Sequence, residues 1–256
     1  MAMAAPMVMT IPTATGPRRC RPMPMPMPMR TAIPMDRTTG TATVTTIRMT
    51  TDALLVLHQL FSPAFPVGSF AYSHGLETLV QEGQVTSAAQ LQDWLEVVLE
   101  QGAGWSDALL LVAAARGEDV ADLAIALAPS AERRLETGKQ GEAFAKAVSA
   151  LWQIELAPAP YPVVVGQVVV ALDLPLEDTL RLYLHAFAAN LAAAGMRLVP
   201  LGQTEGQAVI RALAPLCSDL ARRALEADLT RIGTFSPLAD IASQRHEALY
   251  SRIFRS

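Results

Sequence analysis

Four histidines are the side chains in this sequence best suited to metal binding or acid/base catalysis. They are His58, His74, His185 and His246. Each falls in a different expected helix, and no two have the spacing that places two metal ligands on one helical face. A metal site, or a nucleophile activated by a base, needs several such groups to converge. The sequence therefore predicts neither a metal centre nor a catalytic residue.

The pair Gly138-Lys139 is the one place where a phosphate-binding loop could be sought. Arg133 stands where the first glycine of such a loop belongs, and Gln140 stands where a serine or threonine would follow the lysine. The HExxH motif of metalloproteases and the GxSxG motif of serine hydrolases are absent from the sequence as well. We therefore expect the protein not to be an enzyme.

Composition excludes several other classes of protein. Of 256 residues, 51% are hydrophobic and 17% are charged, and the formal net charge is -4. A disordered chain would be less hydrophobic and a nucleic-acid-binding protein would usually carry a basic excess. With so much apolar surface and only two lysines, permanent protein partners are expected. Cys20 and Cys217 are far apart and form no CxxC motif, which is typical of a reducing cytoplasm.

The first fifty residues differ from the rest of the chain. Residues 1–50 hold six arginines and one acid, a Met-Pro alternation over 22–29 and a threonine-rich run over 38–51. Alternate prolines prevent the amphipathic helix of a transit peptide, and they hold methionine sulfurs apart where Cu(I) binding would need them together. We expect 1–50 to be a disordered Met/Pro/Thr-rich extension, with Met49 as an alternative start, and 51–256 to be the folded domain.

From Asp52 onward the apolar residues recur with a helical period. The expected helices cover about 53–61, 70–83, 88–101, 105–116, 119–127, 131–156, 163–172, 176–199, 203–231 and 237–250. Pro215 should kink or break the helix that contains it. The window 182–201 fails as a membrane span because it contains His185, Asn190 and Arg197. The sequence therefore predicts an all-α fold, a single compact bundle of roughly eight to ten helices.

The valine-rich segment 161–170 is the one place where a strand competes with a helix. Valine favours strands by local propensity. The rest of the sequence, however, offers no second run to pair with such a strand, and a lone strand leaves its backbone groups without hydrogen bonds. We therefore predict a buried helix over 163–172.

A turn and a helix around residues 60–83 form the most unusual stretch. Pro66 and Gly68 should form the turn, and a helix from residue 70 would leave Tyr72 half-buried. The same helix would place His74 and Glu77 on the solvated face, where they offer only a weak acid/base pair for a hydrolase. Gly75, inside that helix, indicates that another backbone packs closely against it.

The run from Leu60 to Glu77 resembles the signature of the UreF family of urease accessory proteins. Ser69 stands where a second glycine is common in that family. Three further blocks are similar to the same family, at 132–144, 197–207 and 246–256, so the resemblance runs in order from about 52 to 256. The first fifty residues have no counterpart in it.

The resemblance implies an all-helical, homodimeric and non-enzymatic nickel-insertion chaperone of the cytoplasm. Its partners would be UreD (also called UreH), the GTPase UreG and, through them, the urease apoprotein, with no nucleic acid and no membrane. It would need no resident cofactor, and nickel could pass through without a dedicated tight site. The alternative is a helical scaffold or ligand-binding protein unrelated to nickel, which a gene neighbourhood lacking urease subunits would favour.

The resemblance also implies roles for particular residues. The expected partner-binding residues are Tyr72, His246, Tyr250, Arg252, Ile253 and Phe254, and the expected structural residues are Pro66, Gly68, Gly75, Glu77, Gly202, Gln203 and Gln207. Apolar and basic side chains share the last eight residues, where chain ends are normally polar. This tail either folds back on its own core or, as we expect, is loosely held until UreD binds and then helps to recruit UreG.

Overall fold

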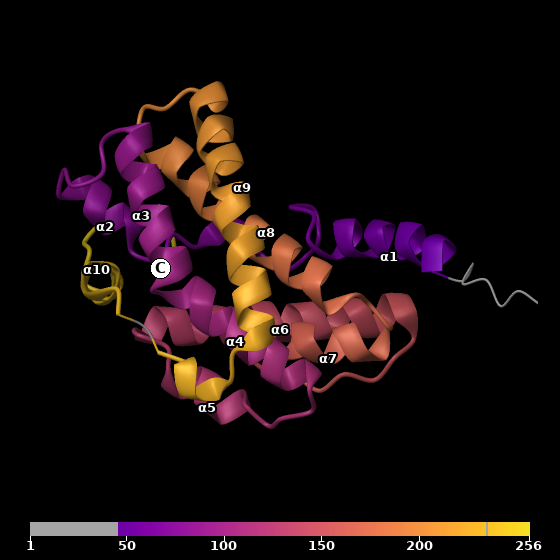
Figure 1. The fold of residues 1–256 in the computed structure, drawn as a ribbon. Coiled ribbons are helices and arrows are strands. Elements are labelled where there is room, and N and C mark those ends of the chain that lie inside the picture. The colour runs from indigo at the N-terminus through magenta and orange to yellow at the C-terminus, as the bar shows by residue number, and fades with distance from the viewer. Residues whose placement is uncertain (1–45, 234) are drawn as a thin grey trace, which may run out of the picture. The chain divides into compact units, whose positions relative to one another are not determined.

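The computed structural model describes residues 46–233 and 235–256, with side chains from Asp52 onward. Its α-helices are α1 (Thr46–Leu60), α2 (Leu76–Gln81), α3 (Ala88–Glu100), α4 (Ala103–Ala115), α5 (Ala121–Ala126), α6 (Ala131–Trp152), α7 (Tyr161–Ala171), α8 (Leu176–Leu198), α9 (Gln203–Glu226) and α10 (Pro237–His246). Two short 3-10 helices cover Ser69–Ala71 and Leu229–Arg231. The described residues contain no strand, so the all-α prediction is confirmed (Figure 1).

The core forms where the longest helices pack against one another. In Figure 1, α9 lies beside α8, and α7 packs against both α4 and α6. The apolar stripe of α3 faces this core, since Leu91, Trp94, Leu95, Val98 and Leu99 are all buried, as predicted. Ser87 caps α3 by accepting a hydrogen bond from the backbone N–H of Gln90. The core therefore joins segments that are more than a hundred residues apart in the chain.

The valine-rich segment is helix α7, as predicted. Pro162 lies in its first turn, where a missing N–H costs nothing, and all the valines that follow are buried except Val170, which is 62% exposed. Gly166 lets the backbone of α4 approach, because a Cβ built there would lie 2.5 Å from the carbonyl oxygen of Leu111. Burial of most of its surface thus explains why this helix is so apolar.

One stretch, Ala88–Ala115, is long and apolar enough to cross a membrane by length and composition. It comprises α3 and α4, which are separated at Gly102, and 72% of its most apolar window is buried inside the protein. The high hydropathy of this stretch is therefore explained by two helices that pack in the protein core.

Several boundaries differ from the sequence-based expectations. Helix α1 begins at Thr46 and not after Asp52, so the last residues of the expected arm are helical. The remainder of that arm lies outside the described residues. Helix α9 continues through Pro215, so of the expected kink or break there is no break. Helix α10 ends at His246 and not at Tyr250.

Candidate functional site

The turn before α2 replaces the helix expected over 70–83. Gly68 has a φ of 73° and Gly75 a φ of 80°, which is the left-handed region that glycine enters without strain. Gly75 therefore precedes α2 and does not lie inside a helix, so that prediction was wrong. The predicted close approach of another backbone is confirmed, because a Cβ on Gly75 would lie 2.5 Å from the backbone nitrogen of Ser243 in α10.

This turn carries His74 and Glu77 into the interior. His74 itself has a φ of 55°, and its side chain is 7% exposed, whereas Glu77 is 1% exposed. The expectation that both residues lie on a solvated face is therefore wrong. Two consecutive left-handed residues reverse the chain before α2 starts, so the helical phase assumed from residue 70 does not hold.

The buried Glu77 carboxylate anchors the C-terminal tail, residues 247–256. Its Oε1 accepts a hydrogen bond from the backbone N–H of Ile253 at 2.8 Å, and its Oε2 accepts one from the N–H of Phe254 at 2.9 Å. Hydrogen bonds to an ionised carboxylate are about twice as strong as neutral ones. Glu77 therefore fixes the backbone of the tail.

His246 lies fully buried between two carboxylates from different helices. Its Nε2 is 3.2 Å from Oε2 of Glu77, and its Nδ1 is 2.7 Å from Oε2 of Glu132 in α6. Each ring nitrogen of His246 therefore has a carboxylate partner. The other oxygen of Glu132 accepts from the guanidinium of Arg252 in the tail. These four side chains join α2, α6, α10 and the tail.

The last three residues complete the attachment of the tail. Phe254 is 4% exposed, and the guanidinium of Arg197 lies 4.5 Å from its ring centroid. The N–H of Arg255 donates to the carbonyl of Ala71 at 2.8 Å, and the N–H of Ser73 donates to the main-chain oxygen of Ser256 at 2.7 Å. The tail is thus folded back on the body, and the expectation of a loosely held tail is not what this structure shows.

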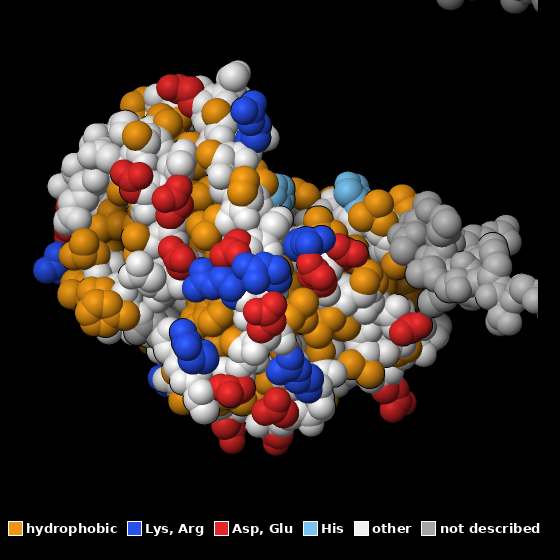
Figure 2. All heavy atoms as spheres, viewed as in Figure 1, with side chains coloured by type: hydrophobic (Ala, Val, Ile, Leu, Met, Phe, Trp, Pro, Cys, Tyr) orange, Lys and Arg blue, Asp and Glu red, His pale blue; other side chains and the backbone are white. Residues whose placement is uncertain are grey.

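Two tail residues that were expected to bind partners face solvent. Tyr250 is fully exposed, and Ile253 is 71% exposed although its backbone N–H is bound to Glu77. Apolar side chains at the preceding helix are exposed too, since Phe235 is 80% and Leu238 is 70% exposed. Figure 2 shows hydrophobic side chains gathered at the edge where α10 lies in Figure 1. The anchored tail and α10 therefore present an apolar surface.

Tyr72 lies beneath the tail and is more buried than expected. It is 5% exposed and not half-buried. Burial, with a contribution from Glu136, raises the pKa of its hydroxyl, and nearby Arg255 partly opposes that rise. The arginine that interacts with Tyr72 is therefore Arg255, whereas Arg252 pairs with Glu132.

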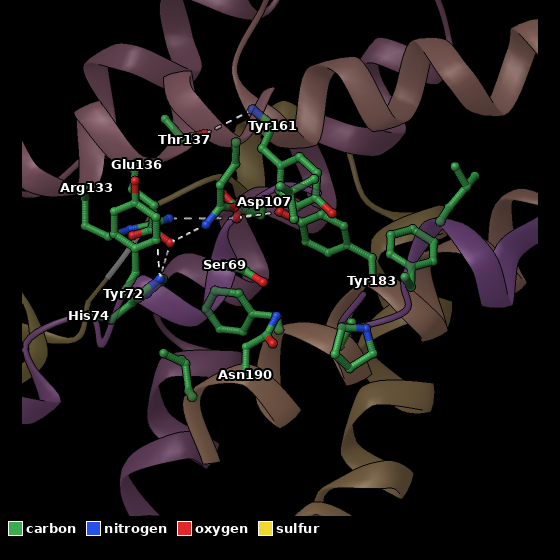
Figure 3. Close-up of a pocket in the computed structure, with 18 of the residues that line it drawn as sticks. Ser69, Tyr72, His74, Asp107, Arg133, Glu136, Thr137, Tyr161, Tyr183 and Asn190 are labelled. Atoms are coloured by element: carbon green, nitrogen blue, oxygen red, sulfur yellow. Dashed lines mark hydrogen bonds and ion pairs between the residues drawn. The ribbon is translucent and has the colours of Figure 1, made fainter. Parts of the chain in front are cut away.

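A second buried ionic network lies deeper, below the end of the tail (Figure 3). His74 Nε2 is 3.0 Å from Oε1 of Glu136 and 3.0 Å from a guanidinium nitrogen of Arg133, which also lies 2.5 Å from Oε2 of Glu136. Burial alone would raise the pKa of Glu136, but the charges of Arg133 and His74 outweigh it and lower this pKa to about 2. Burial and the Arg133 charge lower the pKa of His74.

Asp107 and Tyr183 close the other side of this network. The Tyr183 hydroxyl donates to Oδ2 of Asp107 at 2.8 Å, and burial raises the pKa of Asp107 to about 6 although Arg133 opposes the rise. These groups line a cavity of about 50 Å³ together with Tyr161 and Asn190. That volume suits water and little else. Among the described residues, no group of three or more His, Cys, Asp or Glu side chains is placed to hold a metal ion.

The other expected structural residues lie apart from the tail. Pro66 is exposed in the turn after α1, and Gly202 precedes α9, where its N–H donates to the Glu205 carboxylate at 2.8 Å. Gln203 and Gln207 are exposed on the first turns of α9. The structure therefore places Glu77 and Tyr72 at the tail, Gly75 against α10, and Gly202, Gln203 and Gln207 elsewhere.

Sequence reasoning missed the α6 side of the site. Glu132, Arg133 and Glu136 supply most of the partners for His246, Arg252 and His74. Glu132 and Arg133 are adjacent, and Glu136 follows three to four positions later, so all three lie on neighbouring parts of one helical face. This spacing could have indicated a charged cluster on that face. A charged face is more often solvated, and only the fold shows that this one is buried.

Most of the chain is similar to proteins of one known family. The UreF family model matches residues 85–214. A protein of Roseobacter denitrificans named urease accessory protein UreF is 52% identical over 215 residues, which cover 82% of this chain and 97% of that protein. Proteins of the same name from Cereibacter sphaeroides (strain KD131) and Rhodopseudomonas palustris (strain BisA53) are 53% and 46% identical, each over 80% of this chain and over 99% and 93% of their own. The chain therefore belongs to the UreF family of urease accessory proteins.

Proposed function

We propose that this protein is a nickel-insertion chaperone that works in a complex with UreD (UreH) and the GTPase UreG to activate the urease apoprotein in the cytoplasm. Family membership supports the role in urease maturation. The particular partners and a homodimeric state are what the family resemblance implies. The protein itself is non-enzymatic in this proposal, and nickel is cargo that needs no resident site.

The observation that carries the proposal is that the backbone of the tail is bound to the body while some of its side chains are exposed. Backbone groups of Ile253 and Phe254 are held by Glu77, whereas the side chains of Tyr250 and Ile253 point into solvent. Exposed aromatic and aliphatic side chains on a backbone that is already ordered bind a partner at a low entropic cost. The tail is therefore suited to docking, and UreG is the partner that we propose for it.

The buried networks support a structural role over a catalytic one. Glu77 is occupied by backbone N–H groups of the tail, and His74 is enclosed by Arg133 and Glu136. A general acid or base must reach the substrate proton. Neither side chain is open to a substrate, which agrees with a protein that binds partners.

The exposed charges on the described face do not favour nucleic acid as a partner. Figure 2 shows basic side chains over α9 lying among acidic ones. Arg222 and Arg223 both pair with Asp219 there. A nucleic-acid-binding face would present basic residues without such acidic neighbours.

Co-purification tests the proposal. Tagged wild-type protein, co-expressed with the host's UreD, UreG and urease apoprotein, should retain all of them and yield active urease. Arg252→Ala and Tyr250→Ala should each lower UreG retention at least tenfold while UreD is kept. Arg222→Ala, which removes an exposed arginine of α9, is the matched control. Full UreG retention by both tail variants would refute the docking role, and failure of the wild type to retain UreD would refute the complex.

Deletion of the whole tail is a less specific test than these substitutions. It would remove Phe254 and the two backbone N–H groups that Glu77 binds, and also the His246 side chain if it began at His246. A truncation that also unfolds the protein says nothing of docking. Circular dichroism and thermal melting of each point variant must therefore accompany the co-purification.

A further inference from the structure

Arg133 has more hydrogen-bond donors than the buried ionic network uses. A guanidinium carries several N–H donors and keeps its charge in a protein. Its Nη1 contacts His74 and Glu136, whereas its Nε has no hydrogen-bond partner among the described residues. Its Nη2 lies 4.0 Å from Oδ2 of Asp107, which is beyond hydrogen-bond reach (Figure 3). Because Arg133 is only 7% exposed, bulk solvent does not supply the partners that these donors need.

Ser106 in α4 carries a second polar atom of this kind. Its residue is 4% exposed, and its Oγ has no hydrogen-bond partner in the part of the chain that the structure describes. A serine inside a helix commonly bonds the carbonyl one turn earlier, as Ser218 of α9 does with Ala214 at 3.2 Å. A buried hydroxyl that lacks any partner destabilises the folded state. A partner for Ser106 is therefore expected.

Ser106 and Arg133 line the same cavity, which has a volume of about 30 Å³ and lies between α4, α6 and the loop after α5. Asp107, Thr137 and Asp240 add polar side chains to its wall. A buried water needs roughly 10–15 Å³ of such space and about two to four polar partners. The cavity thus has the volume for a water molecule and the groups to bind it.

The charges around this cavity favour a neutral occupant over an ion. The positive charge of Arg133 is already compensated by Glu136, so it is not free to hold an anion. An anion would also lie close to the carboxyl groups of Asp107 and Asp240. A cation would face the guanidinium, and the described residues place no group of three or more His, Cys, Asp or Glu side chains around a metal. Water has neither conflict.

We propose that an ordered water molecule occupies this cavity and bridges α4 to α6. The water accepts a hydrogen bond from the Nε–H of Arg133, shares one with the hydroxyl of Ser106 and donates one to the carboxylate of Asp107. The ion pair between Asp107 and Arg133 is then mediated by water, which accounts for its 4.0 Å separation. Ser106 becomes a member of the buried ionic network. This inference is independent of the proposed function.

A crystal structure of the full chain at about 2 Å resolution or better tests the site directly. We expect a density peak about 2.7–3.2 Å from both Oγ of Ser106 and Nε of Arg133. Well-ordered side chains with no peak between them would overturn the inference. A crystal soaked in bromide gives the second arm, since an anomalous peak at this position would show an anion site and would overturn the assignment to water.

Ser106→Ala tests the same site in solution, because the direction of its effect depends on the water. If the water is bound, the variant removes one of its partners, and the melting temperature should fall by about 2–4 °C relative to the control. Without the water, the variant removes an unsatisfied hydroxyl, and the melting temperature should rise. Ser218→Ala is the matched control, since Ser218 is exposed inside α9 and reports the helix propensity gained with alanine. A melting temperature of Ser106→Ala equal to or above that of the control would overturn the inference.

Discussion

The carboxylate of Glu77 accepts a hydrogen bond from the backbone N–H of Ile253, 176 positions later in the chain. A contact of this sequence separation fixes the end of the chain against the first short helix of the body. Because the bond is to the backbone of Ile253, it leaves the side chain of that residue free to meet a partner. The buried Glu77 thereby orders the exposed surface of the tail without being part of that surface.

Replacing Glu77 by glutamine should release the tail. A neutral amide offers one weaker acceptor where the carboxylate receives two backbone N–H groups and His246. We expect a loss of roughly 3 kcal/mol in the free energy of unfolding, as is usual when one member of a buried charged network is removed. Amide hydrogen exchange at Ile253 and Phe254 should accelerate in the same variant.

Glu82→Gln is the control for this prediction. Glu82 lies just after α2 and pairs with Arg245 of α10 at 3.2 Å on the surface, where an ion pair contributes less than about 1 kcal/mol. Its substitution should leave tail exchange unchanged. Equal effects of the two variants would show that any charge near α2 stabilises the tail.

Gly75→Ala should be much more damaging than Gly83→Ala. Both glycines have positive φ, at 80° and 72°, so an alanine at either position costs about 1 to 2 kcal/mol in backbone strain. At Gly75 the added Cβ would also lie 2.5 Å from the backbone of Ser243, whereas at Gly83 it would meet nothing within 4 Å. The excess destabilisation at Gly75, measured by urea unfolding, reports the closeness of α2 and α10. Equal losses at the two positions would contradict this packing.

Much of the fold follows from apolar periodicity, because a helix that packs on a core shows its buried face in its own sequence. The stripe of α3 was predicted for that reason, whereas the valine-rich α7 was predicted because the sequence offers no second run to pair with a strand there. At Pro215 the sequence predicted a kink or a break, and α9 continues past this residue without a break. A proline that removes one backbone hydrogen bond can be tolerated when packing on both sides holds the helix together.

The site was less predictable than the fold. The error at His74 and Glu77 arose because the prediction placed every residue from 70 onward on one continuous helix. His74 and Gly75 are left-handed, so α2 begins after them and its residues face other directions than that helix predicted. Gly75 was the available signal, and it was assigned a packing role when it also had a conformational one. The pairing of His246 with Glu132 depends on how α6 and α10 approach in space, which local sequence does not encode.

Asp107 should make the protein less stable as the pH rises. Burial raises its pKa from 3.8 to about 6, so the folded protein favours the protonated acid. Stability from this group is fully present below about pH 4 and is lost as the pH rises through about 6. A shift of about two pKa units corresponds to about 3 kcal/mol.

Asp107→Asn isolates that contribution from the other titrating groups. Asparagine keeps an oxygen that can accept the hydrogen bond from Tyr183 and cannot ionise. The difference in free energy of unfolding between this variant and the wild type should grow in favour of the variant from pH 4 to pH 7. His74 has a lowered pKa and acts in the opposite direction, but it cancels in the difference. A difference that does not change with pH would show that Asp107 is not buried as an acid.

Substitutions of Phe254 and Tyr250 should distinguish a buried side chain that stabilises the tail from an exposed one that binds a partner. Phe254 is 4% exposed beneath Arg197, so Phe254→Ala leaves a cavity and loses the contact with the guanidinium, at a cost of about 3 kcal/mol. Tyr250 is fully exposed, so Tyr250→Ala should change the free energy of unfolding by less than about 0.5 kcal/mol. Urea unfolding of both variants measures these costs.

The same two variants should differ in the way they lose the partner. Tyr250→Ala removes a side chain that touches the partner, so capture should fail although the tail amides stay protected from hydrogen exchange. Phe254→Ala should weaken capture only through release of the tail, so its loss should be reduced by high partner concentration, and exchange at Ile253 should be fast. If Tyr250→Ala captured UreG normally while Phe254→Ala did not, Tyr250 would not be the contact, and capture would depend on another part of the ordered tail.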